Sequence, residues 1–185
     1  MAILSGIKKT GRVLPALLVA ILALSIPVDY AAQEQDEYEV KAAFIFNFLK
    51  FMEWPQTGAS GNFEICILGD DPFEKTLDQL TKGKSAFGRP IQVRRIKDPV
   101  EARSCQIAFA SSAERAKAAK LIDAVRGTAV LTVGETPEFL HAGGMIALSM
   151  DGSHVNIVIN ANATQTAGIK VSAKLMSLAK PYKSD

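Results

Sequence analysis

The sequence predicts an α/β protein: a three-layer sandwich with a mainly parallel, flavodoxin-like sheet, a C-terminal antiparallel hairpin, and helices on both faces. From residue 63 onward, short apolar runs alternate with helical segments, which is typical of a parallel sheet. Near the C-terminus, two apolar runs flank Asp151-Gly152-Ser153, a turn signal that indicates a hairpin. About 150 residues follow an N-terminal leader, which is enough for one domain.

The N-terminal leader, residues 1–32, is predicted to be a secretory signal. A cationic start precedes an uncharged apolar segment over residues 13–28. That segment is shorter than the roughly 20 residues that cross a bilayer. We expect cleavage after Ala31 or Ala32, which leaves residues 33–185 as a single exported domain. An uncleaved membrane anchor is the alternative.

The first helix is predicted over residues 36–53, where Gly and Pro are absent and Trp54-Pro55 ends the pattern. Its apolar residues cover about twice the ~100° arc that a core-facing helix needs. One interpretation is a helix wedged between the sheet and the C-terminal helix. The other is that part of the arc forms a dimer or partner surface. The residues proposed for that surface are Phe44, Ile45, Phe48, Leu49 and Phe51.

Two strand–turn–helix units follow this helix. Residues 63–68 form a short apolar run closed by Gly69-Asp70-Asp71-Pro72, which predicts a strand and a turn. Pro72 can open a helix, which ends near residue 81 before Lys82-Gly83-Lys84. A second strand is predicted over residues 91–96, followed by a short helix over 99–103.

The second half of the chain continues the alternation. A strand is predicted over residues 105–110. A helix follows, which begins at Ser111 or Ser112 and reaches residue 126. Glu114 supports this start, because an acidic residue in the first turn is favoured by the helix dipole. The remaining strands are predicted at 128–133, 145–150 and 154–159. The chain ends in helical sequence over 160–179, with an interruption at Gly168 and a restart at Ser172.

Cys66 and Cys105 are the only cysteines, and they lie on the first and third predicted strands. In the strand order 2-1-3-4-5 these strands are neighbours, and a disulfide needs Cα atoms within about 7 Å. In an oxidising compartment an even pair of cysteines more often forms a disulfide. The sequence therefore predicts a Cys66–Cys105 disulfide, with two buried thiols on adjacent strands as the alternative.

No catalytic, metal-binding or cofactor-binding pattern is found in the sequence. Asp70 and Asp71 resemble the acidic pair of a phosphorylated receiver, yet the third strand ends without an acceptor aspartate. His141 and His154 fit no triad or metal spacing. The formal net charge of +2 leaves no nucleic-acid footprint. The sequence predicts a non-enzymatic protein without a cofactor or nucleic-acid partner.

Two motifs carry a family resemblance: K-A-A-F-I-F-N-F over residues 41–48 and C-I-L-G-D-D-P-F over residues 66–73. With them, the chain resembles the YfiR family of small periplasmic proteins over essentially all of its predicted mature length. Cys66 and Cys105 match the structural disulfide of that family. Some members carry a second cysteine pair toward the C-terminal half, and this chain has none.

The resemblance implies a homodimeric, non-enzymatic regulator of Gram-negative bacteria. Such a regulator binds the periplasmic domain of an inner-membrane diguanylate cyclase and holds it inactive, which lowers cyclic-di-GMP and restrains biofilm formation. An outer-membrane lipoprotein that sequesters the regulator releases the cyclase. The alternative is a periplasmic small-ligand receptor serving another membrane sensor, with a cleft at the carboxyl ends of the strands near Gly69-Asp70, Ser111-Ser112 and Gly134-Glu135.

Overall fold

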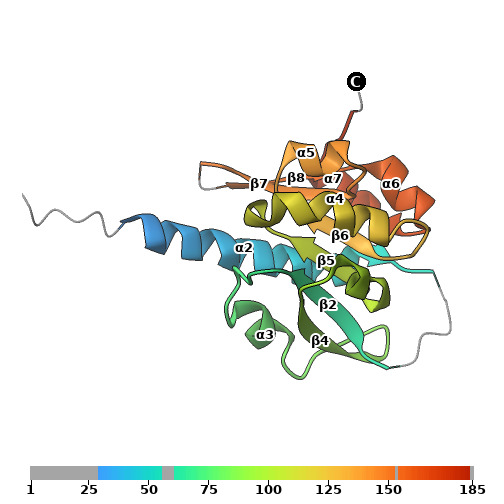
Figure 1. Cartoon of the computed structure of the whole chain (residues 1–185), viewed down its shortest axis with the longest axis horizontal. Helices are drawn as coiled ribbons and strands as arrows, with labels where there is room; N and C mark the ends of the chain where they lie inside the picture. The colour runs from blue at the N-terminus through green and yellow to red at the C-terminus, as the bar shows by residue number, and fades with distance from the viewer. Residues whose placement is uncertain (1–28, 56–60, 153, 184–185) are drawn as a thin grey trace, which may run out of the picture. The chain divides into compact units, whose positions relative to one another are not determined.

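The structure, a computed structural model, describes residues 29–55, 61–152 and 154–183, with side chains from residue 34 onward (Figure 1). The predicted secretory signal therefore lies outside the described residues, except for the backbone of its last four positions. None of the helices in the described ranges combines the length and apolar content that a membrane crossing requires.

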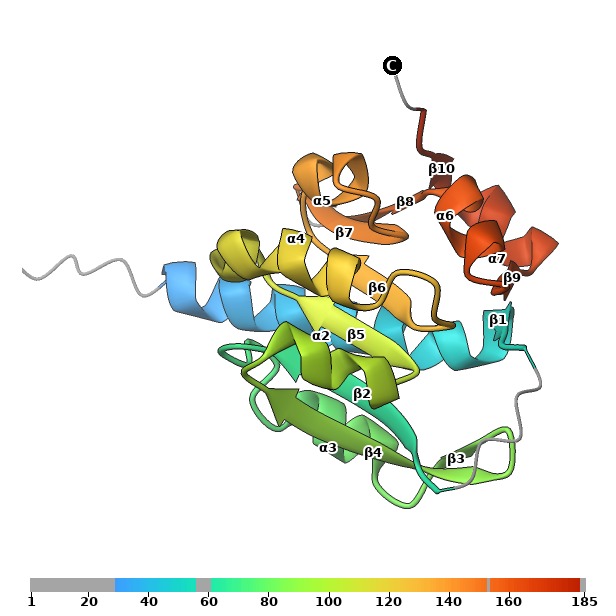
Figure 2. The same ribbon diagram turned by 45° about the vertical axis from the view of Figure 1, so that its right-hand side comes forward.

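A sheet of eight strands in the order β10-β8-β7-β6-β5-β2-β4-β3 forms the middle layer (Figure 2). The strands are β2 (Phe63–Leu68), β3 (Ser85–Ala86), β4 (Arg89–Ile96), β5 (Ile107–Ala110), β6 (Leu131–Gly134), β7 (Ile146–Asp151), β8 (His154–Ile159) and β10 (Lys180–Pro181). From β4 to β7 every neighbouring pair is parallel, and β7 and β8 form the predicted antiparallel hairpin. The order 2-1-3-4-5 of the predicted strands is confirmed.

Helices cover both faces of this sheet. They are α2 (Asp29–Phe51), α3 (Thr76–Thr81), α4 (Arg115–Ala124), α5 (Pro137–His141), α6 (Ala161–Thr166) and α7 (Ala173–Leu178), with 3₁₀ turns η2 (Pro99–Ser104) and η3 (Ser112–Glu114). Figures 1 and 2 both show α4 in front of the sheet and α2 behind it. A separate antiparallel pair joins β1 (Met52–Glu53) to β9 (Lys170–Val171). The predicted three-layer sandwich is confirmed.

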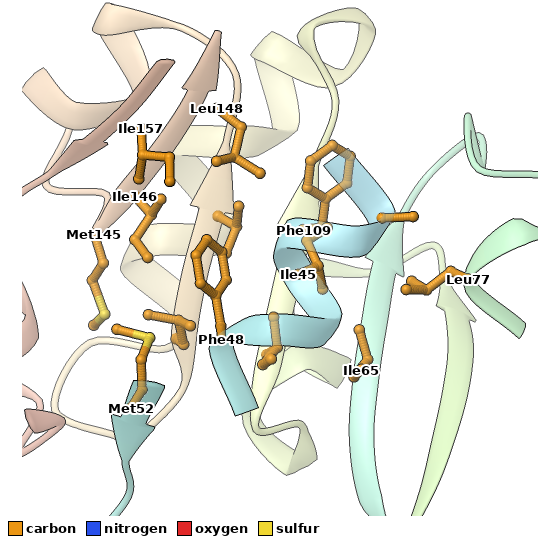
Figure 3. Close-up of a cluster of buried hydrophobic side chains, with 14 of the residues drawn as sticks. Ile45, Phe48, Met52, Ile65, Leu77, Phe109, Met145, Ile146, Leu148 and Ile157 are labelled. Atoms are coloured by element: carbon orange, nitrogen blue, oxygen red, sulfur yellow. The ribbon is translucent and has the colours of Figure 1, made fainter. Parts of the chain in front are cut away.

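Each face of the sheet has its own hydrophobic core, because successive strand residues point to opposite sides. On β2, Ile65 and Ile67 point to the α2 side, whereas Cys66 and Leu68 point to the α4 side. Figure 3 shows the larger core, in which α2 inserts its apolar side chains between strands from both halves of the sheet. The parallel strands are buried on both faces, which explains their near-continuous apolar sequences.

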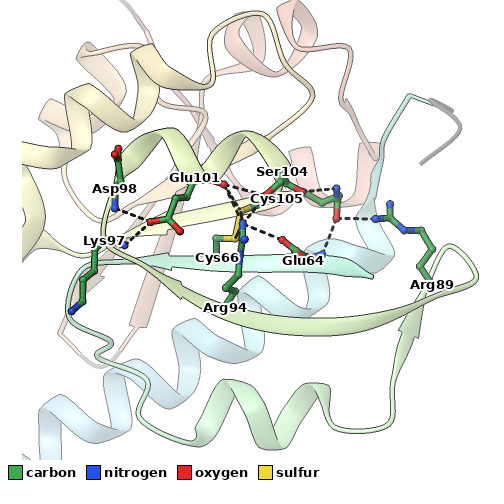
Figure 4. Close-up of a disulfide and its surroundings, with 10 residues drawn as sticks. Glu64, Cys66, Arg89, Arg94, Lys97, Asp98, Glu101, Ser104 and Cys105 are labelled. Carbon is green, nitrogen blue, oxygen red and sulfur yellow. Dashed lines mark hydrogen bonds and ion pairs between the residues drawn. A yellow bond between two sulfur atoms is a disulfide. The ribbon is translucent and has the colours of Figure 1, made fainter. Parts of the chain in front are cut away.

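The predicted disulfide between Cys66 and Cys105 is present, with a Cα–Cα distance of 6.0 Å. Arg94 of β4 covers it: its Nη2 atom lies 3.4 Å from the Cys105 sulfur and 2.6 Å from the Ser104 hydroxyl (Figure 4). The same nitrogen lies 3.1 Å from a Glu64 carboxylate oxygen. The cross-link ties β2 to the segment that precedes β5, on the α4 side of the sheet.

Three helix boundaries near the N-terminus were predicted wrongly. The first helix begins at Asp29, seven residues before the predicted start. It ends at Phe51, two residues before the predicted end at Glu53, because Met52 and Glu53 pair with β9 as strand β1. The next helix begins at Thr76 and not at Pro72. The intervening Glu74 has a φ of 51°, in the left-handed region, which a continuous α-helix does not tolerate.

The C-terminal helical prediction also needs correction. Its interruption at Gly168 is present, with a φ of 72°, but strand β9 lies between the two short helices. The side chains of Asn160 and Ser172 cap α6 and α7 by accepting backbone N–H bonds. Helix α5 was not predicted; the Thr136 hydroxyl caps it by accepting from the Phe139 N–H at 3.3 Å.

Removing the disulfide should lower stability markedly. The bond closes a loop with a sequence separation of 39, for which the chain-entropy model gives about 4 kcal/mol. We expect the double variant Cys66→Ala/Cys105→Ala to lose about that much unfolding free energy in urea titrations. Reductant should destabilise the wild type and leave the double variant unaffected. Equal urea midpoints for oxidised and reduced wild type would contradict the prediction.

Candidate functional site

The carboxyl ends of β2, β5 and β6 lie at one edge of the sheet, where open α/β sheets of this strand order bind their ligands. Gly69 and Asp70 follow β2, Ser111 and Ser112 follow β5, and Glu135 follows β6. These are the three segments at which the sequence placed a possible cleft. The structure opens a cleft beside two of them.

The first segment is closed by Glu114. Gly69 has a φ of 78°, and a Cβ atom at this position would lie 2.0 Å from the Glu114 carboxylate. The backbone N–H of Asp70 donates to the same carboxylate at 3.4 Å. Lys117, 2.8 Å from the other carboxylate oxygen, lowers the pKa of Glu114 below its usual value. The space between β2 and β5 is therefore filled by a charged side chain of the protein itself.

The other two segments border a cleft of about 180 Å³ between α4 and α5. Its polar rim and apolar floor comprise Ala110, Ser111, Ser112, Arg115, Ala118, Ala119, Glu135, Thr136, Glu138, Phe139 and Ala142. The ring of Phe139 fits directly over Gly134 and Gly144, where a Cβ atom would lie 2.4 Å and 2.3 Å from it. Because glycine has no Cβ atom, Gly134 and Gly144 leave the space that the Phe139 ring occupies in the cleft wall.

Glu135 connects this cleft to helix α2. Lys41, with 2% of its surface exposed, donates to the carboxylates of both Glu135 and Glu37. Glu135 is buried as well, with 8% of its surface exposed. Its second carboxylate oxygen accepts a hydrogen bond from the backbone N–H of Ser112 at 2.5 Å. One buried carboxylate therefore joins α2, the loop after β5 and the loop after β6.

Tyr38 completes this polar cluster. Its hydroxyl donates to the Glu135 carboxylate at 3.4 Å, and the Lys41 ammonium lies 4.8 Å from the centre of its ring. The centre of its ring lies 5.6 Å from that of the Phe73 ring, and the two ring planes are nearly perpendicular. Burial, followed by the negative charges of Glu135 and Glu37, raises the pKa of the Tyr38 hydroxyl above its usual value. Tyr38 therefore remains a neutral hydrogen-bond donor to Glu135.

The cleft has a mainly apolar lining with a few charged groups at its border. Glu138 lies at its rim, and its own backbone N–H and the Thr136 hydroxyl lower the pKa of its carboxyl group, so it is ionised at neutral pH. Glu135 supplies a second carboxylate, and Arg115 supplies one cation. His141 and His154 are not among the lining residues; the His141 ring instead hydrogen-bonds to Tyr182 at 2.9 Å.

The helix residues proposed as a partner or dimer surface divide into two groups. Ile45 and Phe48 are 0% and 1% exposed and belong to the core between α2 and the sheet, so for these two the wedged-helix interpretation is correct. Phe44, Leu49 and Phe51 are partly buried and pack against the same core. Ile45 and Phe48 are therefore core residues and not surface residues. The face of the sheet toward α2 is apolar, and a wide apolar stripe on the helix is needed to cover it.

Sequence reasoning did not find the roles of Lys41 and Glu135. A local signal existed at Lys41, since Glu37 precedes it by one helical turn. No local pattern joins Lys41 to Glu135, because 94 positions separate them.

Comparisons with known proteins agree with this fold. A family model described as YfiR/HmsC-like matches residues 38–180. Among solved structures, a conserved domain protein from Vibrio cholerae O1 biovar El Tor has 12% sequence identity and a TM-score of 0.56, with 79% of this chain and 60% of that chain covered. At this identity it shows a shared fold only. The chain thus spans about 60% of that protein's length. No curated protein matches the sequence.

A weaker structural match is the ABC domain in complex with L-Trp from Streptococcus pneumonia, with 11% identity and a TM-score of 0.47 over 64% of this chain and 54% of that chain. This score is too low to support an argument about fold or ligand.

Substitution of Lys41 should destabilise the protein more than that of an exposed lysine in the same helix. Lys41→Met leaves the Glu135 charge buried without its partner, so we expect a loss of about 3–5 kcal/mol of unfolding free energy in urea titrations. Lys50→Met, at an exposed position, should change it by less than about 0.5 kcal/mol. Lys41→Met/Glu135→Gln removes both charges and should recover most of the loss. Equal stability of the two single variants would contradict this role.

Proposed function

This chain belongs to the YfiR/HmsC-like family, and from that membership we propose that it binds the periplasmic domain of an inner-membrane diguanylate cyclase and represses the enzyme. Proteins of this family are periplasmic and regulatory rather than catalytic. In this proposal residues 1–32 direct export and residues 33–185 form the periplasmic domain. Repression lowers cyclic-di-GMP and so restrains biofilm formation.

The family match over residues 38–180 is the observation that carries the proposal. It begins at Tyr38 and includes Lys41, Glu135 and both cysteines, so it covers the polar cluster except Glu37, and the strands that the disulfide joins. A periplasmic regulator is separated by the membrane from the nucleotide that its partner makes. Its action is therefore transmitted by contact with that partner, and the chain needs no chemistry of its own.

The contact surface that we propose is the outer part of helix α2. Val40 is 43% exposed, although it is apolar, and it lies one helical turn before the partly buried Phe44 on the same face. Exposed apolar side chains that adjoin a larger apolar stripe are typical of protein interfaces. We assign this surface to homodimerisation or to cyclase binding, and an outer-membrane lipoprotein that sequesters the regulator would compete with the cyclase.

A second candidate function is a receptor for a small periplasmic ligand, serving another membrane sensor. The cleft between α4 and α5 supports it, because it lies at the ligand-binding edge of the sheet and has charged groups at its rim. The two functions are compatible, since Glu135 borders the cleft and also holds α2.

Deleting the gene should raise cellular cyclic-di-GMP and surface attachment several-fold. Complementation with the wild type should restore both values. Val40→Asp, which alters the proposed surface without opening the core, should be exported in normal amounts and fail to restore them. Val100→Asp provides the matched control, because Val100 is a valine on η2 that is even more exposed, at 58%. Unchanged cyclic-di-GMP after deletion would rule out the assignment to a cyclase.

A thermal-shift screen of small amino-bearing metabolites tests the receptor function. A true ligand at about 100 times its Kd adds about 2.7 kcal/mol to the folded state, which raises the melting temperature by several degrees. Glu138→Gln should abolish this shift without changing the melting temperature of the free protein, because Glu138 is exposed at the cleft rim. A screen in which no compound stabilises the wild type, or in which the variant responds equally, argues against a receptor site here.

A further inference from the structure

The hairpin between β3 and β4 has an unusual residue at its tip. Ala86 pairs with Arg89, so the loop consists of Phe87 and Gly88 alone. Their φ values are 52° and 74°, which defines the type I′ turn in which Asn-Gly is the preferred sequence. A bulky aromatic residue at the first position is disfavoured in the folded state. Because Asn would suit this backbone better, the ring at the tip requires another explanation.

The Phe87 ring is held in place and remains exposed. It lies 5.6 Å from the ring of Trp54 and is stacked on Phe63 at 5.8 Å. Trp54 is anchored in turn, because its Nε1–H donates to the Gln106 carbonyl at 3.2 Å. Even so, 53% of Phe87 faces solvent. Strand β3, which directly precedes Phe87, is the edge strand of the sheet (Figure 2). The protein therefore presents a supported aromatic ring beside this edge.

The chain on either side of Phe87 is rich in basic residues. Residues 79–97 contain six Lys or Arg residues and no Asp or Glu. The guanidinium of Arg95 is bound by Asp71 and Asp78, and Arg94 pairs with Glu64, so the charges farther along β4 are compensated within the chain.

The three cations nearest the hairpin tip, unlike Arg94 and Arg95, have no carboxylate partner in the described part of the chain. Among the described ion pairs none involves Lys82, Lys84 or Arg89. Both lysines are exposed, and Lys84 precedes β3 directly, where its carbonyl accepts the Ile91 N–H at 3.0 Å. Arg89 follows the tip and donates to the Gly61 carbonyl at 3.0 Å. The aromatic tip is thus flanked on both strands by cations without a carboxylate partner.

We propose that this hairpin is a membrane contact that inserts Phe87 among the headgroups of an anionic phospholipid surface. Aromatic rings are favoured at headgroup depth, and lysines near them are attracted to anionic lipids. A two-residue tip by itself offers far less than the roughly 800 Å² per partner that a stable protein interface buries. A bilayer accepts a single ring and needs no matching surface. The combination of an exposed ring and neighbouring cations therefore fits a lipid surface best.

The membrane contact does not depend on the proposed function. Its consequence for cyclase repression rests on that function. A regulator held on the same membrane as its cyclase searches in two dimensions, which raises the effective concentration of each for the other. Weak binding through one ring and three cations is sufficient for that purpose.

Vesicle binding tests the contact, and Trp54 reports it, because it is the only tryptophan in the sequence and lies beside Phe87. Protein recovered from the periplasmic fraction is mixed with vesicles of phosphatidylcholine, either alone or with about one-third phosphatidylglycerol. We expect binding to the anionic vesicles, quenching of Trp54 by brominated lipid chains, and loss of binding at about 1 M salt, where the Debye length is about 3 Å.

Two hairpin variants separate this role from a structural one. Phe87→Asn should raise the melting temperature, because it restores the preferred turn sequence, yet weaken vesicle binding at least about ten-fold and remove the quenching. Lys82→Gln/Lys84→Gln should weaken binding by about five-fold per lysine. Val100→Asn is the control, because it removes an exposed valine elsewhere, on η2. All variants share the N-terminus that export leaves, so differences between them report the hairpin.

The proposal is overturned if the wild type does not bind anionic vesicles, or if Phe87→Asn shows undiminished binding and quenching. It is also overturned if the hairpin variants weaken binding to a purified cyclase periplasmic domain in lipid-free solution, since the hairpin would then be a protein interface. The proposed function fails separately: unchanged cyclic-di-GMP after gene deletion, together with intact vesicle binding, would refute the cyclase assignment alone.

Discussion

Helix α2 meets the rest of the molecule through an apolar stripe and one buried ion pair, between Lys41 and Glu135. The stripe alone allows the helix to rotate or slide, because apolar contacts are not directional. The ion pair removes that freedom, since an unpaired charge at either residue would remain buried at a cost of several kcal/mol. Glu135 also accepts the Ser112 N–H, so the same carboxylate orders the loop at the end of β5. The position of α2 and the shape of the cleft edge therefore depend on one interaction.

The opposite face of the sheet is fixed by covalent means. The Cys66–Cys105 disulfide joins β2 to the start of the β5 segment, and Arg94 covers it from β4. Three adjacent parallel strands are thereby connected in the middle of β2, while the polar cluster connects the loops that follow β5 and β6. The central strands are therefore held together on both faces of the sheet, which suits the proposed contact with a partner.

The proposed surfaces lie on different elements. The cleft is at the carboxyl edge between α4 and α5, the exposed apolar position of α2 is at Val40, and the aromatic tip belongs to the β3–β4 hairpin. Glu135 links the first two, because it borders the cleft and holds Lys41. In the proposed receptor function, a ligand in the cleft would therefore lie beside the contact that holds α2.

The class of fold, the strand order and the disulfide could be predicted from the amino-acid sequence. Apolar runs separated by turn signals are local patterns, and the two cysteines constrain which strands are neighbours. The end of α2 at Phe51, the strand β9 and the burial of Ile45 and Phe48 were decided only by the tertiary structure, because each depends on what packs against the segment. The same holds for Lys41 and Glu135. Each is an ordinary charged residue in its own sequence context, and their role appears only when folding removes both from water at the same place.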